Sequence, residues 1–208
     1  QMVIQVANYI SDIEPYEGGK PISEVARELG IPEKKIVKLA SNENPIGIGK
    51  LTKIAIKNAL KDVERYPDGN GYYLKLALCN KFSLNSDQII LGNGSNDVLE
   101  LAARTFISPG DEVIYSKHAF AVYEIVTKAV GGNGVKAKPQ QDFGHNLDEF
   151  LKLISEKTKL IFIANPNNPT GNLIEKSKIY IFYGFFDNFF REHKKEIRDQ
   201  YLVSMFAT

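Results

Sequence analysis

Short apolar segments alternate with amphipathic helical segments through the middle of this 208-residue chain. The pattern predicts strands at 88–91, 112–116, 135–139 and 159–165, and helices at 72–82, 96–106, 121–132 and 147–155. Strands that alternate with helices of this length are typical of α/β units, in which helices cover both faces of a largely parallel sheet. The alternation therefore predicts an α/β fold, and such sheets bind ligands at the carboxyl ends of their strands.

The sequence outside this alternation predicts a division into three parts. Residues 1–50, with a helical candidate at 21–30, are expected to form an N-terminal arm and part of a small domain. Residues 51–175 begin with a predicted helix at 51–63 and are expected to form the first half of a large domain. Residues 176–208 carry nine of the 22 Phe and Tyr residues and lack the earlier alternation. We expect this segment to be a divergent tail foreign to the fold, with a buried final strand as the simplest interpretation of its IYIFYGFF run.

Composition argues against several classes of function. The 26 basic and 25 acidic residues nearly balance, so we expect no nucleic-acid partner. No stretch approaches the ~18 apolar residues of a membrane span, and the N-terminus lacks the pattern of a secretion signal, which favours a cytoplasmic protein without membrane contact. Cys79 lies in an apolar helical segment and is expected to be a packing residue. The three histidines are far apart and no cysteine cluster accompanies them, so no metal site is expected.

A glycine-rich turn, GNGSND at 92–97, stands between the predicted strand 88–91 and the helix that follows. Gly92 and Gly94 permit a tight turn, and Ser95 and Asn96 fall where the free amides of a helix N-terminus favour a phosphate. A glycine turn with a Ser or Asn cap and no ligand would explain the same residues. The turn lacks the spacing of a P-loop or of a dinucleotide-binding motif, so ATP and NAD are poor candidates.

A second loop, NPNNPTG at 165–171, follows the predicted strand 159–165. Its prolines and glycine fix an extended turn at the carboxyl end of the strand, with the Asn168 amide available as a hydrogen-bond donor. The ordered pair of loops, each after a predicted strand, is more specific than either loop alone.

Five segments together resemble successive signatures of class I/II aminotransferases, and of the histidinol-phosphate aminotransferase family in particular. They are SNENP at 41–45, RYPDGNGYYLK at 65–75, GNGSND, KHAFAVY at 117–123 and NPNNPTG. The similarity runs from about residue 14 to residue 174. It implies the type I pyridoxal-phosphate-dependent fold, an obligate homodimer with shared active sites, and pyridoxal 5'-phosphate as cofactor.

The resemblance also implies roles for individual residues. Ser95 and Asn96 would bind the cofactor phosphate, and Asn168 would donate to the phenolate oxygen of the pyridine ring. Phe120 matches the aromatic residue that stacks on that ring, although an aromatic residue at the start of a helix is more often part of the core. Tyr66 matches a tyrosine that reaches the cofactor phosphate of the partner subunit, and an ordinary turn tyrosine is the alternative.

Two signatures expected after NPNNPTG are absent from the sequence. The family continues with Asp-Glu-Ala-Tyr, whose aspartate keeps the pyridine nitrogen protonated, and later with a Ser-Lys pair that supplies the Schiff-base lysine. Asp187 and Ser177–Lys178 have suitable residue types but come too soon after Asn168. We therefore expect no catalytic lysine in this chain. A shifted reading frame after residue 174, and an unnatural start at Gln1 before Met2, are our hypotheses for the departure.

By resemblance, the complete enzyme would transfer an amino group between glutamate and imidazole-acetol phosphate in histidine biosynthesis, by a ping-pong mechanism with small-molecule donor and acceptor. The chain as given is expected to be truncated and inactive. An aminotransferase for aromatic amino acids and a threonine-phosphate decarboxylase are alternatives that share these signatures. An alternative of another class is a non-catalytic protein that retains only the phosphate site.

Overall fold

The computed structural model describes residues 6–193 and 201–205, and the chain divides into two compact units. Unit 1 combines the start of the chain through Tyr16 with the residues from Gly92 onward. Unit 2 comprises Glu17–Leu91. The division into 1–50, 51–175 and 176–208 remains a prediction.

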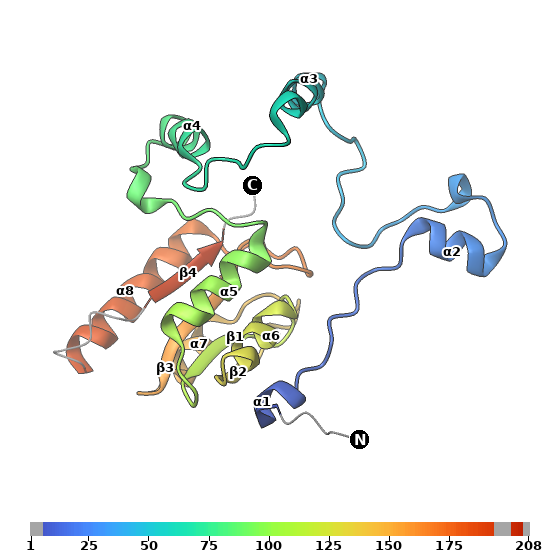
Figure 1. The fold of residues 1–208 in the computed structure, drawn as a ribbon. Coiled ribbons are helices and arrows are strands. Elements are labelled where there is room, and N and C mark those ends of the chain that lie inside the picture. Colours follow the sequence, from blue (N-terminus) through green and yellow to red (C-terminus); the bar gives the residue numbers. More distant parts are fainter. Residues whose placement is uncertain (1–5, 194–200, 206–208) are drawn as a thin grey trace. The chain divides into compact units, whose positions relative to one another are not determined.

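Unit 1 is built on a parallel four-stranded sheet with the strand order β2-β1-β3-β4 (Figure 1). The strands are β1 (Glu112–Ser116), β2 (Asn133–Ala137), β3 (Thr158–Ala164) and β4 (Tyr201–Met205). In the register of the sheet, Ile114 of β1 lies beside Val135 of β2 on one side and Ile161 of β3 on the other. The parallel sheet with intervening helices confirms the predicted α/β fold.

Helices cover both faces of this sheet. They are α5 (Ser95–Phe106), α6 (Val122–Ala129), α7 (Leu147–Leu153) and α8 (Lys176–His193). The short helix α1 (Asn8–Ser11) contacts α6, where the Lys128 ammonium donates a hydrogen bond to the Asp12 carbonyl at 3.3 Å. The beginning of the chain is thereby attached to unit 1.

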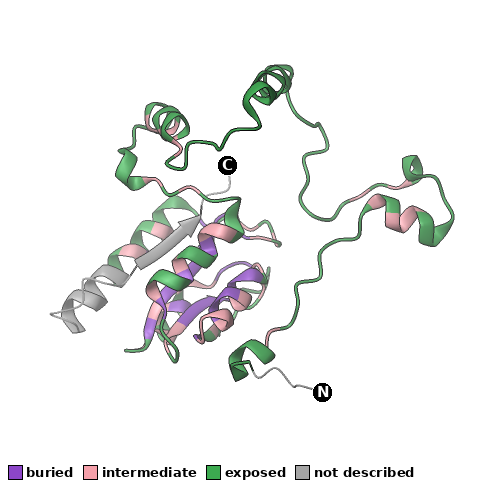
Figure 2. Cartoon of the chain, viewed as in Figure 1, coloured by how far each residue is buried: buried purple, intermediate pink, exposed green. Residues whose placement is uncertain are grey.

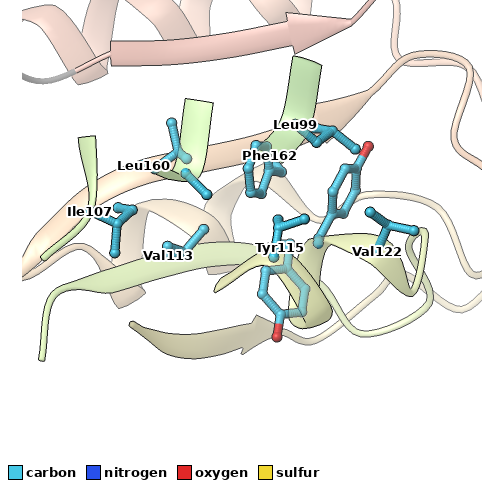
Figure 3. Packing of buried hydrophobic residues seen from close by; sticks show 10 residues of the cluster. Leu99, Ile107, Val113, Tyr115, Val122, Leu160 and Phe162 are labelled. Atoms are coloured by element: carbon cyan, nitrogen blue, oxygen red, sulfur yellow. The ribbon is translucent and has the colours of Figure 1, made fainter. Parts of the chain in front are cut away.

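The two faces follow from the alternation of side chains along β1 and β3. On one face, Val113, Tyr115, Leu160 and Phe162 pack in one cluster with residues of α5 and α6 (Figure 3). The Tyr123 ring of α6 stacks on Phe162 with centroids 4.8 Å apart. The intervening residues pack on the other face with α7, α8 and the loop before α8; they are Ile114, Ile161 and Ile163. Because both faces of these strands are buried, their sequences read as continuous apolar runs.

Unit 2 contains three helices, α2 (Ile22–Leu29), α3 (Lys50–Ala59) and α4 (Tyr72–Phe82), with 3₁₀ turns at Glu33–Lys35, Leu60–Asp62 and Ser86–Gln88. None of its residues is buried, in contrast to the sheet of unit 1 (Figure 2). The loop before α4 is ordered by the Asp68 carboxylate, which accepts hydrogen bonds from the backbone amides of Asn70 and Tyr72 at 3.0 and 2.8 Å. These hydrogen bonds lower the pKa of Asp68.

Two expectations from the sequence are wrong. Residues 88–91 do not form a strand: Ile89 has extended backbone angles, but this segment pairs with no strand in the described structure, and Ile90 is 73% exposed. The alternation also does not stop after Ile174, because residues 176–193 form a helix and β4 then pairs parallel to β3. The IYIFYGFF run is therefore helical and not a strand.

Candidate cofactor-binding site

The GNGSND turn leads directly into α5, and Gly94 is the residue before the helix. Gly94 has φ 95° and ψ 175°, a conformation essentially restricted to glycine, and a Cβ built there would meet no atom within 4 Å. The Asp97 carboxylate holds the turn by accepting a hydrogen bond from the Asn93 amide at 2.9 Å. Ser95 and Asn96 are exposed. The turn and the helix are thus as predicted, with open space beside Gly94.

The direction of α5 places this turn at the carboxyl edge of the sheet. Leu99, near the start of α5, lies beside Phe162 near the end of β3 (Figure 3). Ile107, just after the helix, lies beside Val113 at the beginning of β1 (Figure 3). The helix therefore runs antiparallel to β1 and β3. Its N-terminus, with backbone amides that no side chain of the described residues caps, is where an α/β protein offers an anion site.

The NPNNPTG loop emerges from the same edge, after β3, and asparagine side chains fix its shape. Asn165 binds both backbone groups of Ile174: its amide nitrogen donates to the carbonyl at 3.0 Å, and its oxygen accepts from the amide at 2.7 Å. The Asn167 side chain donates to the Thr170 hydroxyl at 2.7 Å. The loop is therefore closed on itself, and the half-buried Asn168 sits within it.

Asn167 also joins this loop to the segment after β1. Its amide nitrogen donates to the His118 carbonyl at 3.0 Å, which brings the two loops at the ends of neighbouring strands together. Phe120 follows in the β1 loop and is half-buried, with edge contacts to Tyr16 and Tyr123 at 6.2 and 6.1 Å between centroids. Phe120 thus packs at the rim of the core.

Tyr66 belongs to unit 2, in the loop between α3 and α4, and its side chain is fully exposed. The structure therefore groups Ser95, Asn96, Phe120 and Asn168 within unit 1 and describes Tyr66 separately.

The carboxyl edge also holds buried polar atoms without a hydrogen-bond partner among the described residues. They are the Ser116 hydroxyl at the end of β1 and the side-chain oxygen of Asn167. A buried polar group without a partner costs free energy, so this edge has unmet capacity for a polar ligand. An open glycine turn, free helix amides and these atoms fit a phosphorylated cofactor with a polar ring. Sequence reasoning missed Asn165 and Asn167, although both lie in the loop that it singled out.

The described part of the chain shows neither a membrane-spanning helix nor a cluster of metal ligands. Residues 6–193 and 201–205 contain no helix that is long and apolar enough to cross a membrane. Within the same ranges, no group of three or more His, Cys, Asp or Glu side chains gathers where a metal ion could bind.

Together, the parallel α/β fold and the two loops at its carboxyl edge define an α/β protein with a candidate ligand site at that edge. Comparison with protein families is more specific: the model of the family "Aminotransferase class I and II" matches residues 34–187. This chain belongs to that family. The match extends beyond residue 174, where the sequence motifs had placed the end of the similarity.

The most informative curated relatives are histidinol-phosphate aminotransferases. The protein "Histidinol-phosphate aminotransferase 2" of Nitrosospira multiformis is 55% identical over 174 residues, which cover 84% of this chain and 44% of that protein. The enzyme of Methylobacillus flagellatus is 55% identical over 167 residues, 80% of this chain and 45% of that protein. The chain thus spans about half the length of the curated relatives that it matches.

Solved structures agree on the fold. One is the histidinol-phosphate aminotransferase of Sinorhizobium meliloti in complex with pyridoxal-5'-phosphate, which superposes with a TM-score of 0.78 at 21% sequence identity. The superposition covers 98% of this chain and 51% of the Sinorhizobium chain. An aspartate aminotransferase of Thermus thermophilus superposes with a TM-score of 0.74 at 22% sequence identity, over 98% of this chain and 53% of the Thermus chain. The expected type I aminotransferase fold is confirmed over half the length of these proteins.

Proposed function

We propose that this chain carries part of the cofactor site of a histidinol-phosphate aminotransferase, with pyridoxal 5'-phosphate as its cofactor. The complete enzyme would exchange an amino group between glutamate and imidazole-acetol phosphate in the cytoplasm. The observation that carries the proposal is that the Gly94–Ser95 turn and the NPNNPTG loop both lie at the carboxyl edge of the sheet, in a chain 55% identical to an enzyme of that name. An aromatic aminotransferase or a threonine-phosphate decarboxylase would use the same edge.

Four residues of unit 1 would hold the cofactor. The amides at the start of α5 and the side chains of Ser95 and Asn96 would bind the phosphate, where the positive end of the helix favours an anion. Phe120 would pack against the ring, and the Asn168 amide would donate to its phenolate oxygen. When bound, pyridoxal phosphate supplies an electron sink for the substrate's α-carbon. The chain's own contribution would be to orient the ring and to exclude water from its anchored side.

Unit 2 would contribute to a homodimer. Its Tyr66 would reach the phosphate of the other subunit, as its full exposure in a loop allows. Several large apolar side chains of the same unit are also exposed, as expected of residues that an interface covers; examples are Leu39, Ile46 and Leu51 at 90%, 93% and 83%.

A binding experiment tests the proposal. Pyridoxal phosphate should bind saturably to the purified chain, and the double variant Ser95→Ala/Asn96→Ala should bind it at least about tenfold more weakly, because charge-assisted hydrogen bonds contribute about 1.5–3 kcal/mol each. Ser23→Ala, in the first turn of α2, removes a comparable hydroxyl from a helix that follows no glycine turn and should have no effect. Equal affinity of the double variant and the unmodified chain would contradict the proposed site.

A further inference from the structure

A cavity of about 570 Å³ lies on the sheet face opposite α5 and α6, between the segment before α7, the loop before α8 and α8 itself. This volume is typical of small-molecule sites, which span about 300–1,000 Å³. One wall is apolar and includes Leu151, Ile174, Phe182 and Phe185. None of the residues proposed to hold the cofactor lines this cavity.

A buried histidine in the lining has one ring nitrogen without a hydrogen-bond partner among the described residues. The His145 side chain is 4% exposed, and its Nε2 lies 2.9 Å from the Ala164 carbonyl oxygen. That oxygen can only accept, so Nε2 carries the proton and Nδ1 presents a lone pair. Burial lowers the pKa of His145, which favours this neutral form. Nδ1 is buried and has no hydrogen-bond partner among the described residues, so a donor from a ligand would satisfy it.

Charges around the cavity are unbalanced. Among the described residues, three carboxylates, those of Asp142, Asp148 and Glu175, line it together with one ammonium, that of Lys178. Asp142 is held by the Gly144 amide and the Asn172 side chain, each at 3.0 Å. With His145 neutral, two negative charges remain in excess. An anionic ligand is therefore disfavoured, and a cation with an apolar body matches both the charge and the apolar wall.

We propose that this cavity binds a small amphipathic amine, whose positive charge is balanced by the excess of carboxylates in the lining, whose apolar part lies against Phe182 and Ile174, and which donates one N–H toward Nδ1 of His145. The site is separate from the proposed cofactor site, and its occupation does not depend on pyridoxal phosphate.

Tryptamine is a suitable probe because the chain contains no tryptophan, so the indole fluorescence comes from the ligand alone. The full chain, without pyridoxal phosphate, should raise the fluorescence anisotropy of tryptamine to saturation. Two ligands of the same ring system separate charge from hydrophobicity: neutral tryptophol should bind more weakly, and anionic indole-3-acetate at least about tenfold more weakly. Equal binding of tryptamine and indole-3-acetate, or no binding of tryptamine, would overturn the proposal. Either result would leave the proposed cofactor site untested and intact, because the assay contains no pyridoxal phosphate.

Substitutions then locate the probe. The variant Asp148→Asn/Glu175→Gln removes both excess charges and should weaken tryptamine binding about tenfold, which corresponds to about 1.4 kcal/mol. Glu14→Gln neutralises an exposed carboxylate of the same unit outside the cavity and should leave affinity unchanged. Circular dichroism establishes that each variant is folded. If the double variant is folded and binds tryptamine as tightly as the unmodified chain does, the cavity is not the amine site. If the double variant fails to fold, the comparison of the three ligands on the unmodified chain tests the proposal instead.

Discussion

Replacement of Gly94 by alanine tests the phosphate turn at its most constrained point. The added Cβ would meet no atom within 4 Å, so the whole effect comes from the backbone at φ 95° and ψ 175°. A side chain in this region costs about 1–3 kcal/mol. For a chain of this length the loss corresponds to a fall in melting temperature of about 2–12 °C, at about 2–4 °C per kcal/mol.

Relaxation of that strain would move the amides that follow Gly94. We therefore expect Gly94→Ala to weaken pyridoxal phosphate binding at least about tenfold, since a displaced turn loses at least one charge-assisted hydrogen bond worth about 1.5–3 kcal/mol. Melting followed by circular dichroism gives the stability, and equilibrium dialysis gives the affinity.

Gly110 provides the matched control. It has φ 93°, and a Cβ there would also meet nothing within 4 Å, but it lies in the turn between α5 and β1, at the opposite edge of the sheet. Gly110→Ala should lower stability by a similar amount and leave affinity unchanged. The reasoning is refuted if Gly94→Ala changes neither quantity, or if Gly110→Ala weakens binding as much.

The remaining predictions concern the core, a histidine and the interface. Phe162→Ala should lower the free energy of unfolding by about 3–5 kcal/mol in urea denaturation, because it removes a buried ring stacked on Tyr123; a loss below 1 kcal/mol would contradict the packing described. Burial lowers the folded-state pKa of His145, so the stability contributed by the neutral histidine is complete above the ordinary pKa near 6.5. This stability is lost as the pH falls through the lower folded-state pKa. His145→Gln should flatten this dependence when melting temperatures are measured at several pH values. If the chain dimerises, Tyr66→Ala should weaken cofactor binding in the dimer fraction isolated by sedimentation, and an unchanged affinity there would exclude a role across the interface.

Secondary structure was predictable wherever local periodicity and burial agree. The helix at 72–82 has the predicted bounds, and the runs of β1 and β3 are apolar because both faces of the sheet are covered. The segment 88–91 has a similar apolar composition, but a strand needs a partner, which composition does not specify.

In the last helix, the β-branched and aromatic residues favour a strand, whereas the spacing of the core residues is helical. Ile179 and Phe182, three residues apart, face the core, whereas Tyr180 and Ile181 between them are 63% and 60% exposed. That spacing is helical.

Motifs identified the two loops of the candidate site, but not the hydrogen bond that joins the NPNNPTG loop to the segment after β1. Whether Asn167 or Asn168 binds the neighbouring loop depends on the path of a closed turn, and the contact to the His118 carbonyl spans 49 residues of sequence. Such pairings come from tertiary packing and leave no local signal.

We propose that this chain keeps a pyridoxal phosphate site but has no lysine at the position where the family's sequence pattern would supply the Schiff base. The direct measurement is a single-turnover assay of the purified 208-residue chain, saturated with pyridoxal phosphate and mixed with glutamate. A positioned base typically contributes about 100-fold to 10,000-fold in rate, and the sequence supplies none at the expected place. We therefore predict that no pyridoxamine phosphate forms, although the cofactor is bound. Stoichiometric formation of pyridoxamine phosphate would show that a lysine such as Lys178 serves as the base, and would contradict the account.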